Sequence, residues 1–187
     1  MDDGSPLAQN RMTSRLNKQI FTNILSLLWV VVITSVGASA VLSGVNAPPA
    51  LALDYNQGSL INADFAGRDL TDSSFTHANL RNSNLSHTDL QGVSFFAANL
   101  ESANLEGANL SNATLDSARF TRANLSNALL EGAFAANAKF DGVVIDGADF
   151  TDVLLRQDEQ DKLCKVAKGT NPTTGRETRK TLFCPEN

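Results

Sequence analysis

The chain has 187 residues, a formal net charge of −5 at pH 7 and 42% hydrophobic residues, enough for one folded domain with its own core. The acidic surplus argues against a protein that binds the phosphate backbone of nucleic acids.

The first predicted segment is an export signal. It begins with three basic residues, Arg11, Arg15 and Lys18. A stretch without any charged residue follows from 19 to 53, and its apolar centre spans 20–36. A basic start followed by an apolar centre is typical of a secretory signal peptide. Two starting residues fit this pattern, Met1 and Met12.

The end of this segment offers a cleavage site. Ala50 and Ala52 have the A-x-A spacing that signal peptidase accepts, and Pro48 and Pro49 precede them. We therefore predict that residues 1–52 are a signal peptide, cleaved after Ala52. The alternative is an uncleaved membrane anchor, because the apolar stretch approaches the length that spans a bilayer. The segment contains no pair of arginines, which favours export of the unfolded chain.

A five-residue repeat occupies the middle of the chain. From Leu60 to Leu155, every fifth residue is large and apolar, with the single exception of Ala135. A small residue, often alanine, usually stands two positions earlier, and a polar residue such as Asn or Asp separates the two. The phase continues from 60 to 155 without an insertion. Such a repeat decides the fold of the whole region.

A period of five fits neither a regular helix nor a continuous strand. In a helix the repeated residues would be spread around the cylinder, and in a strand an odd step would send them to alternating faces. The repeat works if each unit is a short extended piece followed by a two-residue corner, because the small and large residues then both point inward. Glycines at corner positions, such as Gly92 and Gly107, agree with this. The pattern predicts an all-β solenoid.

The repeated phrase Ala-Asn-Leu-x-x resembles the signature of the pentapeptide-repeat family over residues 58–157. The resemblance implies a right-handed quadrilateral β-helix with four repeats in each coil. Twenty repeats would give about five coils, and side chains twenty residues apart would stack. Asn84, Asn104 and Asn124 are expected to form one such ladder. We assign residues 53–157 to the β-helix domain.

Several outward positions near the end of the repeats are apolar. They are Leu129, Phe134, Val144 and Leu154. Phe134 and Leu154 are twenty residues apart, so they are expected on one face in adjacent coils. Because exposed apolar clusters usually mark a contact, the four residues are a candidate contact patch. Either the C-terminal segment of the chain covers them, or a partner protein or a second copy does.

The composition changes after the repeats, and two short helices are predicted within 158–187. Asp158 is the N-cap candidate of the first helix, and Val166 belongs to its apolar side. Thr174 and Glu177 have the spacing of a capping box for the second. An open solenoid end exposes unpaired strand edges, so this segment is predicted to be an α-helical C-terminal cap.

Cys164 and Cys184 are the only cysteines in the chain. In an exported protein the first interpretation of such a pair is a disulfide. A metal site lacks further ligands, and a redox-active pair is usually much closer in sequence. The pair is therefore predicted to be a disulfide that staples the cap.

The C-terminal segment carries a second resemblance. Its stretches GTNPTTGRETR and LFCP are similar to the tail of pentapeptide-repeat proteins that are targeted to the thylakoid lumen of cyanobacteria and chloroplasts. This resemblance implies a location in the thylakoid lumen, with the periplasm as the alternative. A single short signal without a long transit peptide favours the cyanobacterial type.

No arrangement of residues in the sequence indicates catalysis. His77 and His87 are ten residues apart, half a coil, so they are expected on opposite faces. The stretch GTNPTTGR lacks the Lys-Ser/Thr end of a phosphate-binding P-loop. We therefore predict a protein that is not an enzyme, with no catalytic residues, no cofactor and no metal.

The remaining question is what the solenoid binds. Some pentapeptide-repeat proteins mimic DNA and inhibit topoisomerases, and this is the alternative function. Residues 54–155 contain thirteen acidic and five basic residues, a net charge of −8. B-DNA as long as five coils, about 24 Å, carries roughly fourteen negative charges. The charge falls short, and export would separate the protein from cytoplasmic topoisomerases.

The preferred interpretation is a rigid surface for protein binding or assembly. The partner is a protein of unknown identity, and no nucleic acid is involved. A membrane would be contacted only through an uncleaved N-terminal segment. The protein itself would be a monomer or a weak homodimer.

Overall fold

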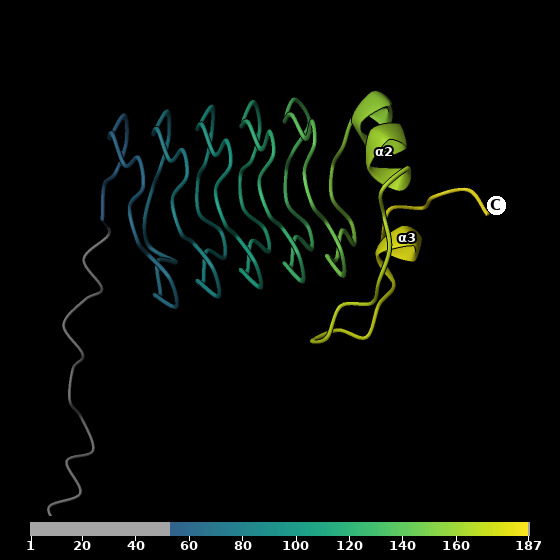
Figure 1. The fold of residues 1–187 in the computed structure, drawn as a ribbon. Coiled ribbons are helices and arrows are strands. Elements are labelled where there is room, and N and C mark those ends of the chain that lie inside the picture. The colour runs from purple at the N-terminus through teal and green to yellow at the C-terminus, as the bar shows by residue number, and fades with distance from the viewer. Residues whose placement is uncertain (1–52, 187) are drawn as a thin grey trace, which may run out of the picture. The chain divides into compact units, whose positions relative to one another are not determined.

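The computed structural model describes residues 53–186. The predicted signal peptide, its alternative as an anchor, the cleavage site and both starting methionines lie outside the described residues. Within 53–186 the chain winds into regular coils and continues into two helices, α2 (Gln157–Cys164) and α3 (Thr178–Thr181), at the C-terminal end of the coils (Figure 1). In this part of the chain, no helix has the length and apolar character needed to span a bilayer.

The coils repeat every twenty residues. A parallel bridge joins residues twenty apart at every fifth position, from Asp54 with Ser74 to Phe134 with Leu154. Beside the first bridge, the N–H of Tyr55 donates to the carbonyl of Ser74 at 2.9 Å, and the N–H of Ser74 donates to the carbonyl of Leu53 at 3.1 Å. The bridges form four columns, so each coil has four sides and every extended piece is one bridge long.

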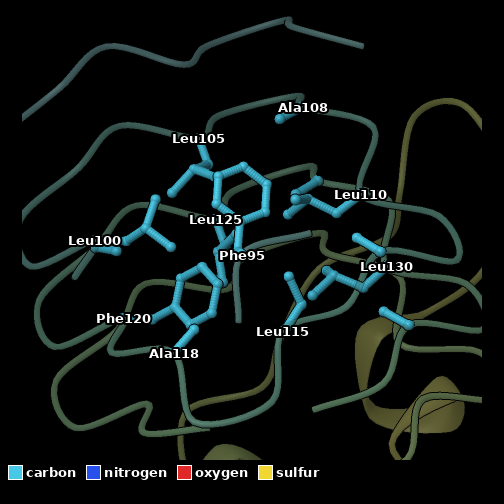
Figure 2. Close-up of a cluster of buried hydrophobic side chains, with 14 of the residues drawn as sticks. Phe95, Leu100, Leu105, Ala108, Leu110, Leu115, Ala118, Phe120, Leu125 and Leu130 are labelled. Carbon is cyan, nitrogen blue, oxygen red and sulfur yellow. The ribbon is translucent and has the colours of Figure 1, made fainter. Parts of the chain in front are cut away.

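Both inward positions of the repeat fill the core. The large residues at every fifth position from Phe65 to Phe150, the small Ala135 included, are at most 4% exposed. Figure 2 shows Leu100, Leu105 and Leu110, which come from successive sides, pointing into one interior. Full burial of a side chain of this size contributes about 1.5–3 kcal/mol, so the core is the main source of stability.

Aromatic side chains stack along the interior. The rings of Phe75 and Phe95, in adjacent coils, are 5.1 Å apart and nearly parallel. The ring of Tyr55 lies on the other side of Phe75 at 4.8 Å and is also parallel to it. Tyr55 is therefore a member of the repeat, one unit before Leu60, where the sequence pattern was expected to begin.

The corners depend on a residue with positive φ. The second corner residue has φ of 71° at Gly92 and 57° at Asn112, a conformation that Gly and Asn accept most readily. The outward polar residue stabilises the same turn. The Oδ1 of Asn104, for example, accepts a hydrogen bond from the N–H of Glu106 at 3.2 Å. The alternation of inward apolar, outward Asn and corner Gly follows from this geometry.

The predicted asparagine ladder is confirmed. The Nδ2 of Asn124 donates to Oδ1 of Asn104 at 3.2 Å, and the Nδ2 of Asn104 donates to Oδ1 of Asn84 at 3.5 Å. The Nδ2 of Asn84 continues the ladder to Oδ1 of Asp64 at 3.0 Å. Side chains twenty residues apart therefore stack outside the coils as well as inside.

Both helices of the C-terminal segment form, but the N-capping residues that were predicted for them are wrong. The N-cap residue of α2 is Arg156, and Asp158 lies within the helix, where its carboxylate accepts a hydrogen bond from Nε of Arg156 at 2.9 Å. Glu177 is the N-cap residue of α3 but makes no side-chain cap. The hydroxyl of Thr174 donates instead to Asp149 at 2.8 Å, because that buried carboxylate is the stronger acceptor.

Candidate functional site

Cys164, the last residue of α2, and Cys184, which follows α3, form a disulfide with Cα atoms 5.5 Å apart. This is the pairing that the two cysteines predicted. The link holds both short helices together, and it is supported by the carbonyl of Cys164, which accepts a hydrogen bond from Nη1 of Arg179 at 2.9 Å. The C-terminal segment is therefore ordered by a covalent bond in addition to its contacts with the coils.

Glu159 in α2 replaces part of a further coil. Its carboxylate is 1% exposed and accepts a hydrogen bond from the N–H of Phe140 at 3.3 Å and from Nζ of Lys139 at 3.2 Å. Within the coils, the equivalent N–H of Phe120 donates to the carbonyl of Lys139, nineteen residues later, at 2.7 Å. The residue nineteen positions after Phe140 is Glu159. Here the side-chain carboxylate accepts the hydrogen bond, whereas within the coils the main-chain carbonyl of the corresponding residue accepts it.

Two further N–H groups of the last coil end on the C-terminal segment. The N–H of Gly147 donates to the carbonyl of Lys168 at 2.9 Å, and the N–H of Phe150 donates to the hydroxyl of Thr181 at 3.1 Å. The core also continues into this segment, since Leu163 and Leu182 are buried with the side chains of the coils. The segment thus closes most of the end of the solenoid.

Asn171 fixes the loop between the helices to the coils. Its side chain is fully buried, and Nδ2 donates to the carbonyls of Gly147 at 2.9 Å and Asn127 at 3.2 Å. Its Oδ1 accepts hydrogen bonds from the N–H groups of Thr173 and Thr174 at 2.9 and 3.1 Å. One side chain therefore joins the loop to two successive coils.

Asp149 is a buried carboxylate on the outward position of the last coil. It accepts hydrogen bonds from the hydroxyls of Thr151 at 2.6 Å and Thr174 at 2.8 Å, and Nη1 of Arg176 lies 3.3 Å away. Burial acts to raise the pKa of Asp149, but these hydrogen bonds and the charge of Arg176 outweigh it, so that the pKa lies below its ordinary value. The charged form of Asp149 therefore stabilises the docked loop.

We expect Asp149→Asn to weaken the acid sensitivity of the protein. A carboxylate with a lowered pKa stabilises the fold above its unfolded pKa of about 3.9, and this contribution is lost as the pH falls through the folded pKa. The unfolding free energy of the wild type should therefore drop more steeply below pH 4 than that of the variant. Urea unfolding at several pH values measures the difference. Asp152→Asn, at an exposed corner, is the control, and parallel curves for wild type and Asp149→Asn would contradict the expectation.

The structure divides the four candidate contact residues among three sides of the coil. Phe134 and Leu154 are bridge partners in adjacent coils and are 43% and 61% exposed. Leu129 is half-buried and bridges Asp149 on the next side, whereas Val144 belongs to a third column and is 46% exposed. A single patch of four residues is therefore wrong, because the twenty-residue register separates residues that are close in sequence.

Phe134 and Leu154 lie together on a weakly charged side of the coils. The outward residues of its column are Asp54, Ser74, Ser94, Thr114, Phe134 and Leu154. The exposed fractions of Phe134 and Leu154 show that the C-terminal segment does not cover these two side chains. The expectation that the chain's own C-terminal segment covers them is therefore wrong. We call these two residues the apolar pair.

The two histidines lie on separate corners. His77 contacts the ring of Phe96 edge-on, with the ring centres 5.6 Å apart, and His87 lies beside Gly107 in the next coil. Over residues 53–186, no group of three or more His, Cys, Asp or Glu side chains is placed to hold a metal ion.

Four-sided coils of five-residue units, stacked in parallel and closed by a short helical segment, define this chain as a β-solenoid protein. The chain belongs to the pentapeptide-repeat family, whose members fold as right-handed β-helices. The family model described as pentapeptide repeat region matches residues 68–150. The β-helical fold predicted from the repeat is therefore confirmed.

Two similar proteins come from the thylakoid lumen. The crystal structure of a pentapeptide repeat protein from the Arabidopsis thaliana thylakoid lumen is 43% identical, with a TM-score of 0.52, and the match covers 72% of this chain and 86% of that one. Thylakoid lumenal 15 kDa protein 1, chloroplastic, from Arabidopsis thaliana is 65% identical over 37 residues. This second match spans 20% of this chain and only 16% of that protein.

Proposed function

We propose that this chain is a non-enzymatic protein of the thylakoid lumen whose β-helix presents the apolar pair to a protein partner. In this proposal residues 53–157 form a scaffold of about five coils, and residues 158–187 are a cap that prevents the coils from stacking on other chains. The protein acts as a monomer or a weak homodimer, without a cofactor and without nucleic acid.

The observation that carries the proposal is the rigid exposure of the apolar pair. The N–H of Phe134 donates to the carbonyl of Ala113 at 2.9 Å, and the N–H of Leu154 donates to the carbonyl of Ala133 at 3.1 Å. The backbone below both side chains is therefore held by the ladder. Two large apolar side chains, fixed side by side and left in water, are the kind of surface that a partner protein covers.

The proposed location rests on similarity and on the N-terminal sequence. Two similar proteins are described as thylakoid lumenal, and residues 1–52 have the pattern of a signal peptide cleaved after Ala52. Export to the periplasm is the alternative. DNA mimicry gains no support from the distribution of charge, because Arg119 and Lys139 bridge each other and make one side of the last coils basic.

We expect Phe134→Ser to reduce capture of the partner at least about fivefold, since a buried apolar contact of this size contributes more than about 1 kcal/mol. Tagged full-length protein is crosslinked in thylakoids and the captured proteins are quantified. Val144→Ser is the matched control, because Val144 is equally exposed on another side. Both variants should keep their unfolding free energy within about 0.5 kcal/mol. Equal capture by the two variants would contradict the proposed role of the apolar pair.

A further inference from the structure

One side of the last coil ends without a hydrogen-bonding partner. In the coil below, the N–H of Ala135 donates to the carbonyl of Leu154 at 3.0 Å. The corresponding groups of the last coil are the N–H of Leu155 and the carbonyl of Val153, and neither makes a hydrogen bond with any of residues 53–186. We call Val153–Leu155 the open edge, and it carries Leu154 of the apolar pair.

The other sides of the last coil are covered. Glu159 and Thr181 accept from the N–H groups of Phe140 and Phe150. On the side of Val144 the N–H of Ile145 has no acceptor within 53–186, but residues 168–169 lie over the adjoining corner, where Gly169 packs against Gly147. The carbonyl of Val143 on that side has no donor within 53–186 either, but Val143 and Ile145 are buried, whereas Val153 and Leu155 of the open edge are only half-buried.

A gap in the core adjoins the open edge. A small space of about 60 Å³ lies between the last coil and the C-terminal segment. It is lined by Phe150, Val153, Leu155, Gln160, Thr181, Leu182 and Phe183. Apolar side chains and polar groups such as those of Gln160 and Thr181 contribute about equally to its exposed lining, so the gap offers room for one small side chain. Phe183, on the rim, is 78% exposed and covers the gap only partly.

A wider depression of about 390 Å³ continues from this gap along the surface. Its lining includes Thr151, Arg176, Glu177 and Lys180, and it shares Thr181 and Phe183 with the gap. Arg176 is paired with Glu131 and Asp149, and Lys180 is paired with Glu177, so the depression carries no positive surplus.

These features identify the chemistry of the occupant. An unpaired N–H and an unpaired carbonyl two residues apart on an extended piece are complementary to another extended main chain. A second copy of the solenoid cannot continue the coils here, because α2 and the loop after it cover the neighbouring sides. An extended segment of a different protein meets no such obstacle.

We propose that the open edge is a strand-addition site for an extended segment of a partner protein. The segment pairs in parallel with Val153–Leu155 and inserts a side chain into the gap above Leu155. This inference rests on the proposed function, because it specifies how the partner that covers the apolar pair is bound.

The register of the coils specifies which groups of the segment are needed. By analogy with Leu154, the residue over Leu154 donates its N–H to the carbonyl of Val153 and accepts from the N–H of Leu155. The N–H of the following residue points away from the open edge, as the N–H of Leu155 itself does from the coil below. Methylation of the first N–H should therefore prevent pairing, and methylation of the second should not.

The probe is a synthetic peptide with the sequence of residues 111–117. Thr114 belongs to the column of Leu154, so its copy fits over Leu154, and the copy of Leu115 fits over Leu155. Three forms are compared: unmodified, N-methylated at the Thr114 copy, and N-methylated at the Leu115 copy. Binding to the isotope-labelled protein is followed by NMR, together with hydrogen exchange of the Leu155 amide.

We expect the unmodified and the Leu-methylated peptides to bind and to slow exchange at Leu155, and the Thr-methylated peptide to bind at least about tenfold more weakly. Equal affinity of the two methylated peptides, or no binding of the unmodified peptide, would overturn strand addition. The proposed function is judged separately. If Phe134→Ser reduces partner capture while the peptides fail to discriminate, the apolar pair binds its partner without strand addition. If the peptides discriminate but capture by Phe134→Ser is unchanged, the proposed role of the pair fails instead.

Discussion

Phe95→Ala is expected to lower the free energy of unfolding by about 3–5 kcal/mol, the usual cost of removing a buried phenylalanine ring. The side chain is fully buried, and its ring stacks on Phe75 at 5.1 Å. Each coil contacts only its neighbours, so the cavity cannot be filled from elsewhere in the chain. Urea unfolding followed by circular dichroism measures the loss.

The adjacent residue offers a matched control of the same type. Phe96 is at a corner, 39% exposed, and contacts His77 edge-on. Phe96→Ala should therefore cost less than about 1 kcal/mol. Equal losses for Phe95→Ala and Phe96→Ala would mean that the inward and outward positions of the repeat are wrongly assigned.

Replacing both cysteines, in the variant Cys164→Ala/Cys184→Ala, is expected to lower the free energy of unfolding by roughly 3 kcal/mol. The disulfide closes a loop of twenty residues, and the entropy of the open loop in the unfolded chain favours unfolding. The loop includes Asn171 and Thr181, whose side chains satisfy groups of the last coils. Release of this loop should therefore destabilise the last coils of the β-helix.

Urea unfolding with and without a reducing agent tests this expectation. The reducing agent should lower the midpoint of the wild type toward that of the double variant and leave the double variant unchanged. Hydrogen exchange of Gly147 and Phe150, whose N–H groups are bonded to the C-terminal segment, reports the local effect. An unchanged midpoint of the reduced wild type would show that the non-covalent contacts alone hold the segment.

The coils could be predicted from the sequence because one local rule is repeated. Leu100, Leu105 and Leu110 each repeat the same inward position, so a misreading of one unit would conflict with all the others. Tyr55 lies within the predicted domain but before Leu60, where the repeat pattern was expected to begin, and no small residue precedes it by two positions, since Leu53 stands there. The stack on Phe75 places it in the core nevertheless.

The C-terminal segment was harder to predict because its partners are distant in sequence. Thr174 bonds to Asp149 instead of capping α3, and Val166, expected on the apolar side of its helix, is half exposed. Glu159 and Asn171 have ordinary sequence surroundings, and their roles depend on the last coil below them. No local pattern signals such contacts, since tertiary packing decides them.

The division of the contact residues, in contrast, was available in the sequence. The twenty-residue register that joins Phe134 to Leu154 also assigns Leu129 and Val144 to other columns. Closeness along the chain is a poor guide in a solenoid, because five residues suffice to turn onto the next side. Only residues a whole coil apart share a surface.

The same register restricts how such a chain can change length. Loss of twenty residues from the middle would shorten the stack by about 4.8 Å and leave every later side chain facing in its former direction. Loss of five would preserve the core pattern but swing Phe134, Leu154 and the whole stapled end through a quarter turn relative to Asp54. Related chains whose lengths differ by one five-residue unit can therefore have equally well packed cores and still present their surface residues in different directions.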